Sequence, residues 1–478
     1  MIPIITPSIM EEELALEIQN PIDRVEAAVE AILLELLRLI EPSSHLIFLI
    51  GKGLNGADGL CLALKCIEAG LDCSVLLLFD PKEFKPTTTH FYKKISSYSV
   101  LKPLNLPKKG DFVLIDALFG AGFKGLLPEQ LHNFFKQVNQ SPFLKISLDI
   151  PSGIEGSTGQ GSVFIQAHFT LSIGFPKWGC FIHQGRNASG QVIHVPLSLK
   201  GEVAHKKALA YFITPQSLED LSYPEASTLH KYERGQVLGF ASHPSYKGAS
   251  TLYTHAAYRT GAGIVRLLYE KGAPFFNDLP PEVTQHELTQ LDDFCLKPKI
   301  ACVIGPGLVM SPAIKTALSK ILEKKIPAVL DGGALQGLDL SKLHPQLILT
   351  PHLDELRRIL QKEGAGFDEL IEGAKTRLLP TGLTLVVKGH HSWILQSGKL
   401  PVIASLAPSC MATAGAGDVL SGILGAYLAK QHSGFESALL GVSLHGLAGR
   451  TASESLSKRA IMASDILDAI PETLSTYF

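Results

Sequence analysis

The sequence contains little that would direct the protein to nucleic acid or to a membrane. Its 43 Lys and Arg residues nearly balance its 45 Asp and Glu residues, for a formal net charge of -2, and no run of like charges is longer than three residues. The apolar stretch 31–40 is interrupted by Glu35 and Arg38, so we expect no membrane span. Residues 11–13 are acidic where a secretory signal would be basic. We therefore expect a cytoplasmic protein with small-molecule partners, and neither nucleic acid nor membrane.

Cysteine is also sparse and irregularly spaced. The seven cysteines include no CxxC pair, and their odd number cannot form a complete disulfide framework. We expect reduced thiols in the core.

The length and the patterning indicate two domains. With 478 residues, of which 46% are hydrophobic and 18% are charged, the chain is too long for one ordinary core, and we expect domains at 1–205 and 206–478. Predicted strands and helices alternate in both halves. This alternation predicts an α/β fold with two three-layer αβα domains on largely parallel sheets.

A glycine-rich turn opens into an amphipathic helix at 412–430, ATAGAGDVLSGILGAYLAK. Gly415 and Gly417 leave the backbone free of Cβ atoms, and apolar residues recur at helical spacing behind them. We expect the helix to begin near Asp418, where free N–H groups and the helix dipole favour a phosphoryl group. Asp418 is then either a base for a substrate hydroxyl or only the N-cap, and this stretch alone leaves both readings open.

The first half carries a glycine pattern after its first long strand, which we expect at 45–50. Gly51, Gly53 and Gly56 satisfy GxGxxG ahead of a helix expected around 59–69, and Asp80 ends the next strand. Such a pattern is typical of dinucleotide binding, although three glycines often serve packing alone. A simple NAD-dependent dehydrogenase is an alternative that rests only on these residues.

Polar residues then follow several predicted strands. Because parallel strands present their carboxyl ends at one edge of a sheet, we expect Asn55, Asp58, Asp116, Asp149 and Ser152 to converge there. Each aspartate could instead cap a turn. Three such sites at the ends of strands together favour a functional site at this edge of the sheet over separate turn caps.

The motifs GKGLNGADG, DALFGAGFKG and SLDIPSG, in that order, resemble those of the NAD(P)H-hydrate epimerase domain. The resemblance implies potassium bound by Asn55, Asp116 and Ser152, and Asp149 as the acid-base group. The implied substrate-binding residues are Leu54, Asn55, Gly56, Ala57, Asp58, Gly120, Ala121, Gly122, Phe123, Lys124, Gly125, Leu126 and Asp149. Leu54 and Ala57 depart from the usual NNGGDG form, so a binding or scaffold module without catalysis is an alternative.

Strand-end motifs recur in the second half as YKGAS, GPG, DGGAL, TPHLDE, VVKG and AGAGD. We expect Gly248 and Ala249 in a ligand-binding loop, and His352 and Lys388 just after strands. Taken singly, His352 would more often be a hydrogen-bonded loop residue, and Lys388 a solvated one.

The order of these motifs resembles the ADP- or ATP-dependent NAD(P)H-hydrate dehydratase domain, whose fold is ribokinase-like. The resemblance implies that Ala249, Gly307, His352 and Asp418 contact the hydrated dinucleotide. It implies that the adenine nucleotide is contacted by Lys388, Gly389, His390, His391, Ser392 and Gly417. DGGAL at 331–335 departs from the usual DADAL.

Together the two resemblances imply a bifunctional repair enzyme, an isomerase and a lyase, which returns both epimers of hydrated NADH or NADPH to the reduced coenzyme. ADP or ATP would phosphorylate the C6 hydroxyl so that it can leave, with Mg²⁺ bridging phosphate and protein. We also expect a homo-oligomer. The main alternative is a ribokinase-like vitamin or sugar kinase fused to a dinucleotide-binding or scaffold module.

Overall fold

The computed structural model describes residues 1–17, 20–98, 100–102, 106–107, 110–221, 228–273, 276–295, 297–457 and 459–478. Its contacts divide the chain into an N-terminal unit, Ile2–Phe212, and a C-terminal unit, Ile213–Phe478, to which Met1 is also assigned. The division falls seven residues beyond the boundary predicted near residue 205. Whether the two parts fold separately stays a prediction.

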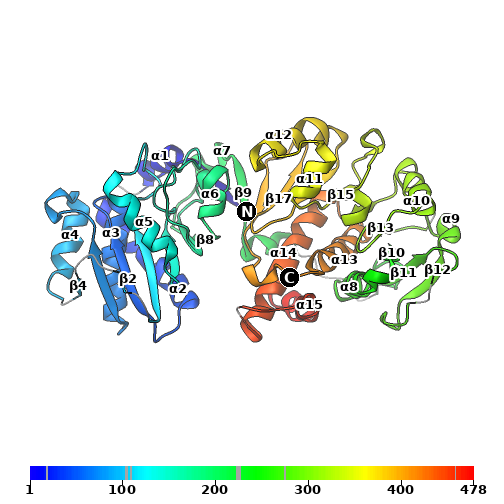
Figure 1. The fold of residues 1–478 in the computed structure, drawn as a ribbon, viewed down its shortest axis with the longest axis horizontal. Helices are drawn as coiled ribbons and strands as arrows, with labels where there is room; N and C mark the ends of the chain where they lie inside the picture. The colour runs from blue at the N-terminus through cyan, green and yellow to red at the C-terminus, as the bar shows by residue number, and fades with distance from the viewer. Residues whose placement is uncertain are drawn as a thin grey trace. The chain divides into compact units, whose positions relative to one another are not determined.

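The N-terminal unit is built on a fully parallel sheet (Figure 1). Its order is β4 (Leu101–Lys102), β3 (Cys73–Leu77), β2 (His45–Ile50), β5 (Phe112–Ala117), β6 (Leu144–Leu148), β7 (Phe169–Ile173) and β8 (Gln191–Val195). Its helices are α1 (Pro7–Glu17), α2 (Pro21–Leu39), α3 (Leu54–Glu68), α4 (Pro86–Ile95), α5 (Glu129–Gln140), α6 (His183–Ala188) and α7 (Glu202–Lys206). A short antiparallel pair joins β1 (Ile2–Ile4) to β9 (Ala210–Ile213).

Alternating strand residues explain the three layers of this unit. Phe48 packs into a cluster with α2 and α3, whereas its neighbour Leu49 packs into a second cluster with α5. Successive side chains of a strand point to opposite faces, so each face of the sheet is covered by helices. The predicted Rossmann-like αβα class is confirmed.

The C-terminal unit has a second, largely parallel sheet. Its order is β18 (Val402–Ala404), β17 (Ser392–Gln396), β16 (Thr384–Val387), β15 (Leu347–Leu349), β14 (Ala328–Leu330), β13 (Ile300–Ile304), β10 (Gln236–Phe240), β11 (Ile264–Tyr269) and β12 (Thr284–Glu287). Only the pairs β16–β17 and β17–β18 in this order are antiparallel. The predicted α/β class with a largely parallel sheet is confirmed for this unit.

Helices cover both faces of the second sheet (Figure 1). One layer holds α8 (Lys247–Arg259), α13 (Ala416–Ala429), α14 (Gly434–Ser455) and α15 (Ala463–Tyr477), and the other includes α10 (Pro312–Glu323), α11 (Leu353–Leu360) and α12 (Phe367–Arg377). The short α9 (Leu291–Cys295) precedes β13. A Cβ at Gly422 would collide with the Tyr253 carbonyl, so glycine permits the close approach of α13 to α8.

The α13 helix begins earlier than its sequence predicts. Gly415, at φ 90°, is the N-cap, and Asp418 lies inside the first turn. The reading of Asp418 as the N-cap is therefore wrong. The left-handed conformation of Gly415 lets the chain turn sharply into the helix without a capping side chain.

Two other helices also begin earlier in the chain than the sequence predicts. Asn55 and Asp58 were expected in a turn before a helix at 59–69, but α3 already begins at Leu54 and includes both. Gly248 and Ala249 were expected in a loop and lie in the first turn of α8. In both places helix formation extends back through residues that the glycine-rich patterns assigned to turns.

All seven cysteines are free, and five of them are buried. No helix in the described ranges combines the length and the apolar character that crossing a bilayer requires.

Two candidate active sites

Asp116 and Ser152 form the buried floor of the first site, in the N-terminal unit. Asp116 Oδ1 accepts a hydrogen bond from Ser152 Oγ at 2.5 Å, and Oδ2 accepts bonds from Ser152 N at 2.9 Å and Ser147 Oγ at 2.7 Å. Burial raises the pKa of Asp116, while these hydrogen bonds oppose the rise. The edge of the sheet thus joins β5, β6 and the loop after β6, as the strand-end argument predicts.

Asn55 lies in the first turn of α3 and is only 6% exposed. Neither polar atom of its amide has a hydrogen-bond partner among the described residues. A Cβ added at Gly120 would lie 3.3 Å from Asn55 Cβ and 3.5 Å from Asp149 Oδ2, which places these three residues together. An unpartnered buried amide costs about 1–3 kcal/mol, so its retention suits a ligand-binding role.

Asp149 is held from two sides. Its Oδ2 accepts a hydrogen bond from Ala121 N at 3.1 Å, and its Oδ1 forms an ion pair with the Lys177 ammonium. Its backbone is left-handed at φ 69°, a conformation that costs a non-glycine residue free energy and that clusters at functional sites. Lys177 belongs to none of the recognised motifs, and sequence reasoning missed it.

Asp58, on α3, completes the acidic cluster. Burial raises the pKa of this carboxyl to about 8, the Asp149 charge adds to the rise, and Lys177 opposes it. Asp58 is therefore largely neutral at pH 7, where it can donate a hydrogen bond.

The remaining residues of the first set differ widely in exposure. Ala57 is fully buried in the core, whereas Leu126, at the end of the predicted 120–126 loop, is 84% exposed. Asp80 caps a short 3-10 helix by accepting a hydrogen bond from Lys82 N at 2.9 Å. Asp80 is therefore a helix cap, which is the structural role that an aspartate after a strand often has.

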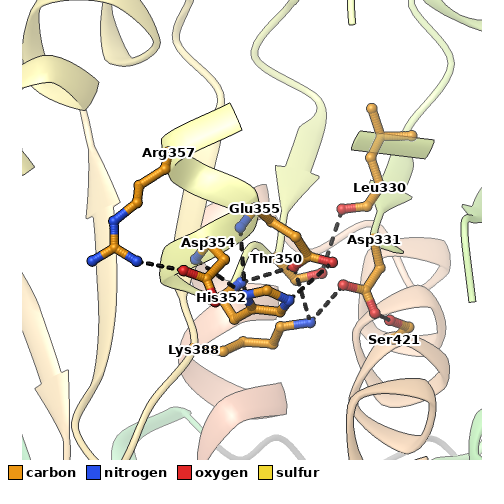
Figure 2. A network of polar contacts seen from close by, with 9 residues as sticks. All are labelled: Leu330, Asp331, Thr350, His352, Asp354, Glu355, Arg357, Lys388 and Ser421. Atoms are coloured by element: carbon orange, nitrogen blue, oxygen red, sulfur yellow. Dashed lines mark hydrogen bonds and ion pairs between the residues drawn. The ribbon is translucent and has the colours of Figure 1, made fainter. Parts of the chain in front are cut away.

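The second site, in the C-terminal unit, is centred on an ion pair between Lys388 and Asp331 (Figure 2). Lys388 Nζ lies 2.6 Å from Asp331 Oδ1 and 3.9 Å from Glu355 Oε2. Asp331 Oδ2 accepts a hydrogen bond from Ser421 Oγ of α13 at 3.1 Å. The solvated reading of Lys388 is wrong, because its side chain is 21% exposed and paired.

The charges of this pair act on Asp418. Burial raises the pKa of its carboxyl to about 6, the Asp331 charge adds to the rise, and Lys388 lowers it. A Cβ on Gly417 would lie 3.5 Å from Lys388 Nζ and 3.7 Å from Asp331 Oδ2, so the ion pair borders the first turn of α13. A carboxylate, an ammonium and a helix N-terminus therefore meet at one place.

His352 begins α11 and caps it. Its Nδ1 accepts hydrogen bonds from Asp354 N at 3.2 Å and Glu355 N at 3.4 Å, while Glu355 Oε2 accepts one from His352 N at 2.9 Å (Figure 2). This reciprocal arrangement is a capping box. His352 is therefore a hydrogen-bonded residue, as we expect of it when it is taken singly. The capping box also positions Glu355 beside Lys388.

The other residues of the second set fall into two groups. Ala249 and Gly307 are neighbours, since a Cβ on Gly307 would lie 2.8 Å from Ala249 Cβ. Ser392 Oγ donates to Gly389 O at 3.3 Å, and the buried His391 Nδ1 lies 3.1 Å from Ser405 Oγ. His390 stacks at a tilt on His391.

A pocket of about 410 Å³ adjoins the Lys388 pair, and sequence reasoning did not find it. Its wall includes Gly332, which follows Asp331 in the chain, and Glu355, which lies beside Lys388. Arg358 and Ile359 of α11 also line it. The DGGAL segment supplies part of the wall. A Cβ on Gly333 would collide with the Leu308 carbonyl, so in this chain the second acid of DADAL is excluded by the close approach of that carbonyl.

The fold and the two sites define a two-unit α/β enzyme with separate acid-base clusters at the carboxyl ends of its parallel strands. Residues 240–472 match the family described as NAD(P)H-hydrate dehydratase, and residues 22–179 match the family described as YjeF-related protein N-terminus.

Relatives match over nearly the whole chain. The bifunctional NAD(P)H-hydrate repair enzyme Nnr of Moorella thermoacetica is 30% identical over 468 residues, covering 90% of this chain and 87% of that one. The enzyme of the same name from Coxiella burnetii is 31% identical over 436 residues, covering 87% of each. The chain belongs to the family of bifunctional NAD(P)H-hydrate repair enzymes.

Among solved structures, the ADP/ATP-dependent NAD(P)H-hydrate dehydratase of Bacillus subtilis, co-crystallised with ATP and Mg²⁺, is 24% identical. The TM-score is 0.49, and the match covers 56% of this chain and 99% of that one.

Proposed function

We propose that the N-terminal unit interconverts the R and S epimers of hydrated NADH and NADPH, and that the C-terminal unit dehydrates the S epimer at the expense of ADP or ATP. The observation that carries this division is the presence of two acidic clusters in different units, one around Asp149 and one around Asp418. Each cluster places a carboxylate beside a lysine ammonium. The domains at 1–205 and 206–478 would then each hold one activity.

In the epimerase site, Asp149 serves as the acid-base group for the C6 hydroxyl. The hydroxyl leaves with a proton as water while the ring nitrogen lone pair forms a C=N bond, and water then adds to either face. Asn55 to Asp58 and the 120–126 loop would hold the dinucleotide. Asp149 would give this proton to the leaving hydroxyl and take one back when water adds.

The oxygen set of Asn55, Asp116 and Ser152 fits potassium. The carboxylate and hydroxyl are in contact, and the amide of Asn55 is buried and unpartnered, so hard oxygen donors are available. A bound K⁺ would supply positive charge for the dinucleotide phosphates.

In the dehydratase site, Asp418 takes the C6 hydroxyl proton as that oxygen attacks the terminal phosphorus. The N–H groups at the start of α13 and the Lys388 ammonium would hold the phosphoryl group. The phosphate ester then leaves with the C6–O bond electrons as the ring nitrogen supplies its lone pair. Ala249, Gly307 and His352 would contact the hydrated dinucleotide.

The Asp331 carboxylate fits Mg²⁺. Its Oδ2 would lie 3.7 Å from a Cβ on Gly417, so it borders the turn where the phosphoryl group would bind. Mg²⁺ is bound in proteins by one or two carboxylates together with substrate phosphates, and it would neutralise the charge developing there.

The direct test incubates the purified protein with both NADHX epimers, or both NADPHX epimers, and either ADP or ATP. We expect nucleotide-dependent return of dihydronicotinamide absorbance, with both epimers consumed. Accumulation of a stable phosphorylated product would instead support a kinase. The four combinations also assign the coenzyme and nucleotide preferences.

Dehydration should depend on pH through Asp418. Its pKa is raised from 3.8 to about 6, so the carboxylate is ionised above pH 6 and protonated below it. A base must be ionised to accept a proton, so the single-turnover rate should fall about tenfold for each pH unit below 6. The measurement uses saturating nucleotide from pH 5 to 8.

The matching variant for this pH dependence is Lys388→Met. Because Lys388 lowers the Asp418 pKa, the midpoint of the pH–rate profile should lie at a higher pH in the variant than in the wild-type protein. A rate that stays constant through pH 6 in the wild-type protein would exclude Asp418 as the base.

Gly417→Ala should weaken nucleotide binding without harming the fold. Gly417 has no positive φ, and the new Cβ would make only ordinary contacts with Lys388 and Asp331. Alanine favours a helix by up to about 1 kcal/mol over glycine, so the melting temperature should hold or rise. The methyl group would nevertheless stand where phosphate approaches the backbone, and calorimetry should show weaker ADP and ATP binding.

Gly248→Ala is the control for this substitution. Gly248 occupies the same second position of α8, and a Cβ there meets nothing within 4 Å. Its nucleotide affinity should match that of the wild-type protein. Equal affinity in Gly417→Ala would contradict a phosphate site at the start of α13.

A further inference from the structure

In the Asp149–Lys177 ion pair, the lysine side chain is buried more deeply than the aspartate side chain. The Asp149 side chain is 16% exposed, whereas that of Lys177 is 3% exposed. Lys177 Nζ also donates a hydrogen bond to Ile173 O at 2.5 Å. A ligand at this edge would meet Asp149, with the ammonium behind it.

The segment that carries Lys177 is fastened by backbone hydrogen bonds. Ile5 N donates to Pro176 O at 3.0 Å, and Trp178 N donates to Ile5 O at 2.8 Å, on either side of Lys177. The lysine therefore comes from a fixed segment. Its charge is held at one place beneath the carboxylate.

We propose that Lys177 is a positioning residue for epimerisation, which fixes the Asp149 carboxylate and stabilises its negative charge while the C6–O bond is broken. The inference rests on the proposed role of Asp149. Lys177 binds one carboxylate oxygen and the Ala121 N–H binds the other, so the carboxylate cannot rotate freely.

The proton balance of the step shows where this charge acts. The step starts with Asp149 protonated. As the C6–O bond breaks, its carboxyl gives this proton to the leaving hydroxyl, which departs as water, and the ring nitrogen lone pair forms the C=N bond. The carboxylate that remains lies against Lys177. Addition of water to the opposite face breaks the C=N bond and returns the proton, so nothing is consumed.

A buried ion pair could instead serve only the fold, because burial of either charge alone is strongly unfavourable. Lys145 offers the matched control. It is also buried in the N-terminal unit, at 5% exposure, but its ammonium donates to Ser141 O and Phe143 O, both at 3.0 Å. A loss caused only by removing a buried ammonium should appear in Lys145→Met as well.

The experiment uses the full chain and follows R to S conversion of NADHX by chromatography without nucleotide, which keeps dehydration silent. The variants are Lys177→Met, Lys177→Arg, Asp149→Asn, the Lys177→Met/Asp149→Asn double variant and Lys145→Met. We expect Lys177→Met to lower kcat roughly 10-fold with KM nearly unchanged. Lys177→Arg should recover part of the loss, and Lys145→Met should keep the wild-type kcat.

The double variant is decisive. If Lys177 acts through Asp149, adding Lys177→Met to Asp149→Asn should change kcat by less than about twofold. A full additional loss in that background, or a loss confined to KM, would overturn the inference. Wild-type kcat in Asp149→Asn would instead refute the proposed role of Asp149 itself.

Folding is checked on the same preparations by circular dichroism and by dehydration of S-NADHX in the other unit. If Lys177→Met does not fold, Lys177→Gln, which keeps a donor for the Ile173 carbonyl, replaces it in the same cycle. Rescue of kcat by Lys177→Arg supports the inference, because a purely steric role gives no reason for the charge to matter.

Discussion

Replacing Asp418 with Asn should lower nucleotide-dependent dehydration on the order of 100-fold or more, the scale expected when a positioned base is lost. The change removes the carboxylate but keeps the side chain's shape. The N–H groups at the start of α13 remain, so adenine nucleotide should bind nearly as before, or slightly tighter with one negative charge removed. Single-turnover dehydration of S-NADHX and calorimetry on one preparation would measure both quantities.

Asp465 supplies the control for Asp418. It occupies the same third position in the first turn of α15, where its Oδ2 accepts a hydrogen bond from Met462 N at 2.7 Å. Asp465→Asn should cost at most about 1 kcal/mol of stability and leave turnover unchanged. Dehydration near the wild-type rate in Asp418→Asn would reject Asp418 as the base, and early melting or loss of nucleotide binding would favour a structural role.

The position of the first site could be predicted from the sequence because parallel topology determines where strand ends lie. Asp116 lies near the end of β5 and Asp149 follows β6, and the two strands pair in parallel, so both carboxylates reach the same edge. The hydrogen bonds between Asp116 and Ser152 follow from that pairing. The local pattern of strands was sufficient for this inference.

Lys177 could not be predicted in the same way. It lies after β7 in a segment whose place depends on backbone hydrogen bonds to Ile5, at the other end of the N-terminal unit. Nothing in FPKWG marks a lysine that turns inward to a carboxylate. Such a pair is set by long-range packing, which short motifs do not encode.

The second site shows a similar limit. Lys388 was predicted as a ligand contact, but its pairing with Asp331 depends on the order of the sheet. The strands β14, β15 and β16 are adjacent and parallel, so residues just after β14 and β16 come within reach of one another. Ser421 joins them only because α13 packs close to this edge.

Helix starts were the weakest local predictions. The sequence pattern placed glycine-rich residues in turns, yet α3 begins at Leu54 and α13 at Ala416. Glycine is compatible with a first helical turn when tertiary contacts hold it there, although it has low helix propensity. The consequence is chemical, because Asn55 and Asp418 project from helical first turns, and Asp58 from the following turn of α3, instead of flexible loops.

Replacing Asp149 with Asn should lower epimerisation by roughly 100- to 10,000-fold, the range for loss of a general acid-base group. Dehydration of the S epimer should continue, because the Asp418 cluster lies in the other unit. With nucleotide present, the variant should consume S-NADHX and leave R-NADHX behind, apart from its spontaneous epimerisation. Chromatographic separation of the two epimers over time would measure both activities in one reaction.

The structural risk of this change is specific, because Asn leaves the Lys177 ammonium buried without its ion partner. Removing one partner of such a pair can cost about 3–5 kcal/mol, so the melting temperature must be measured beside the rate. Asp80→Asn is the matched control, since Asp80 also follows a strand of this unit but only caps a 3-10 helix. It should epimerise at the wild-type rate. Unchanged interconversion of epimers in a folded Asp149→Asn variant would return Asp149 to a structural role and leave the left-handed backbone at φ 69° without a catalytic reason.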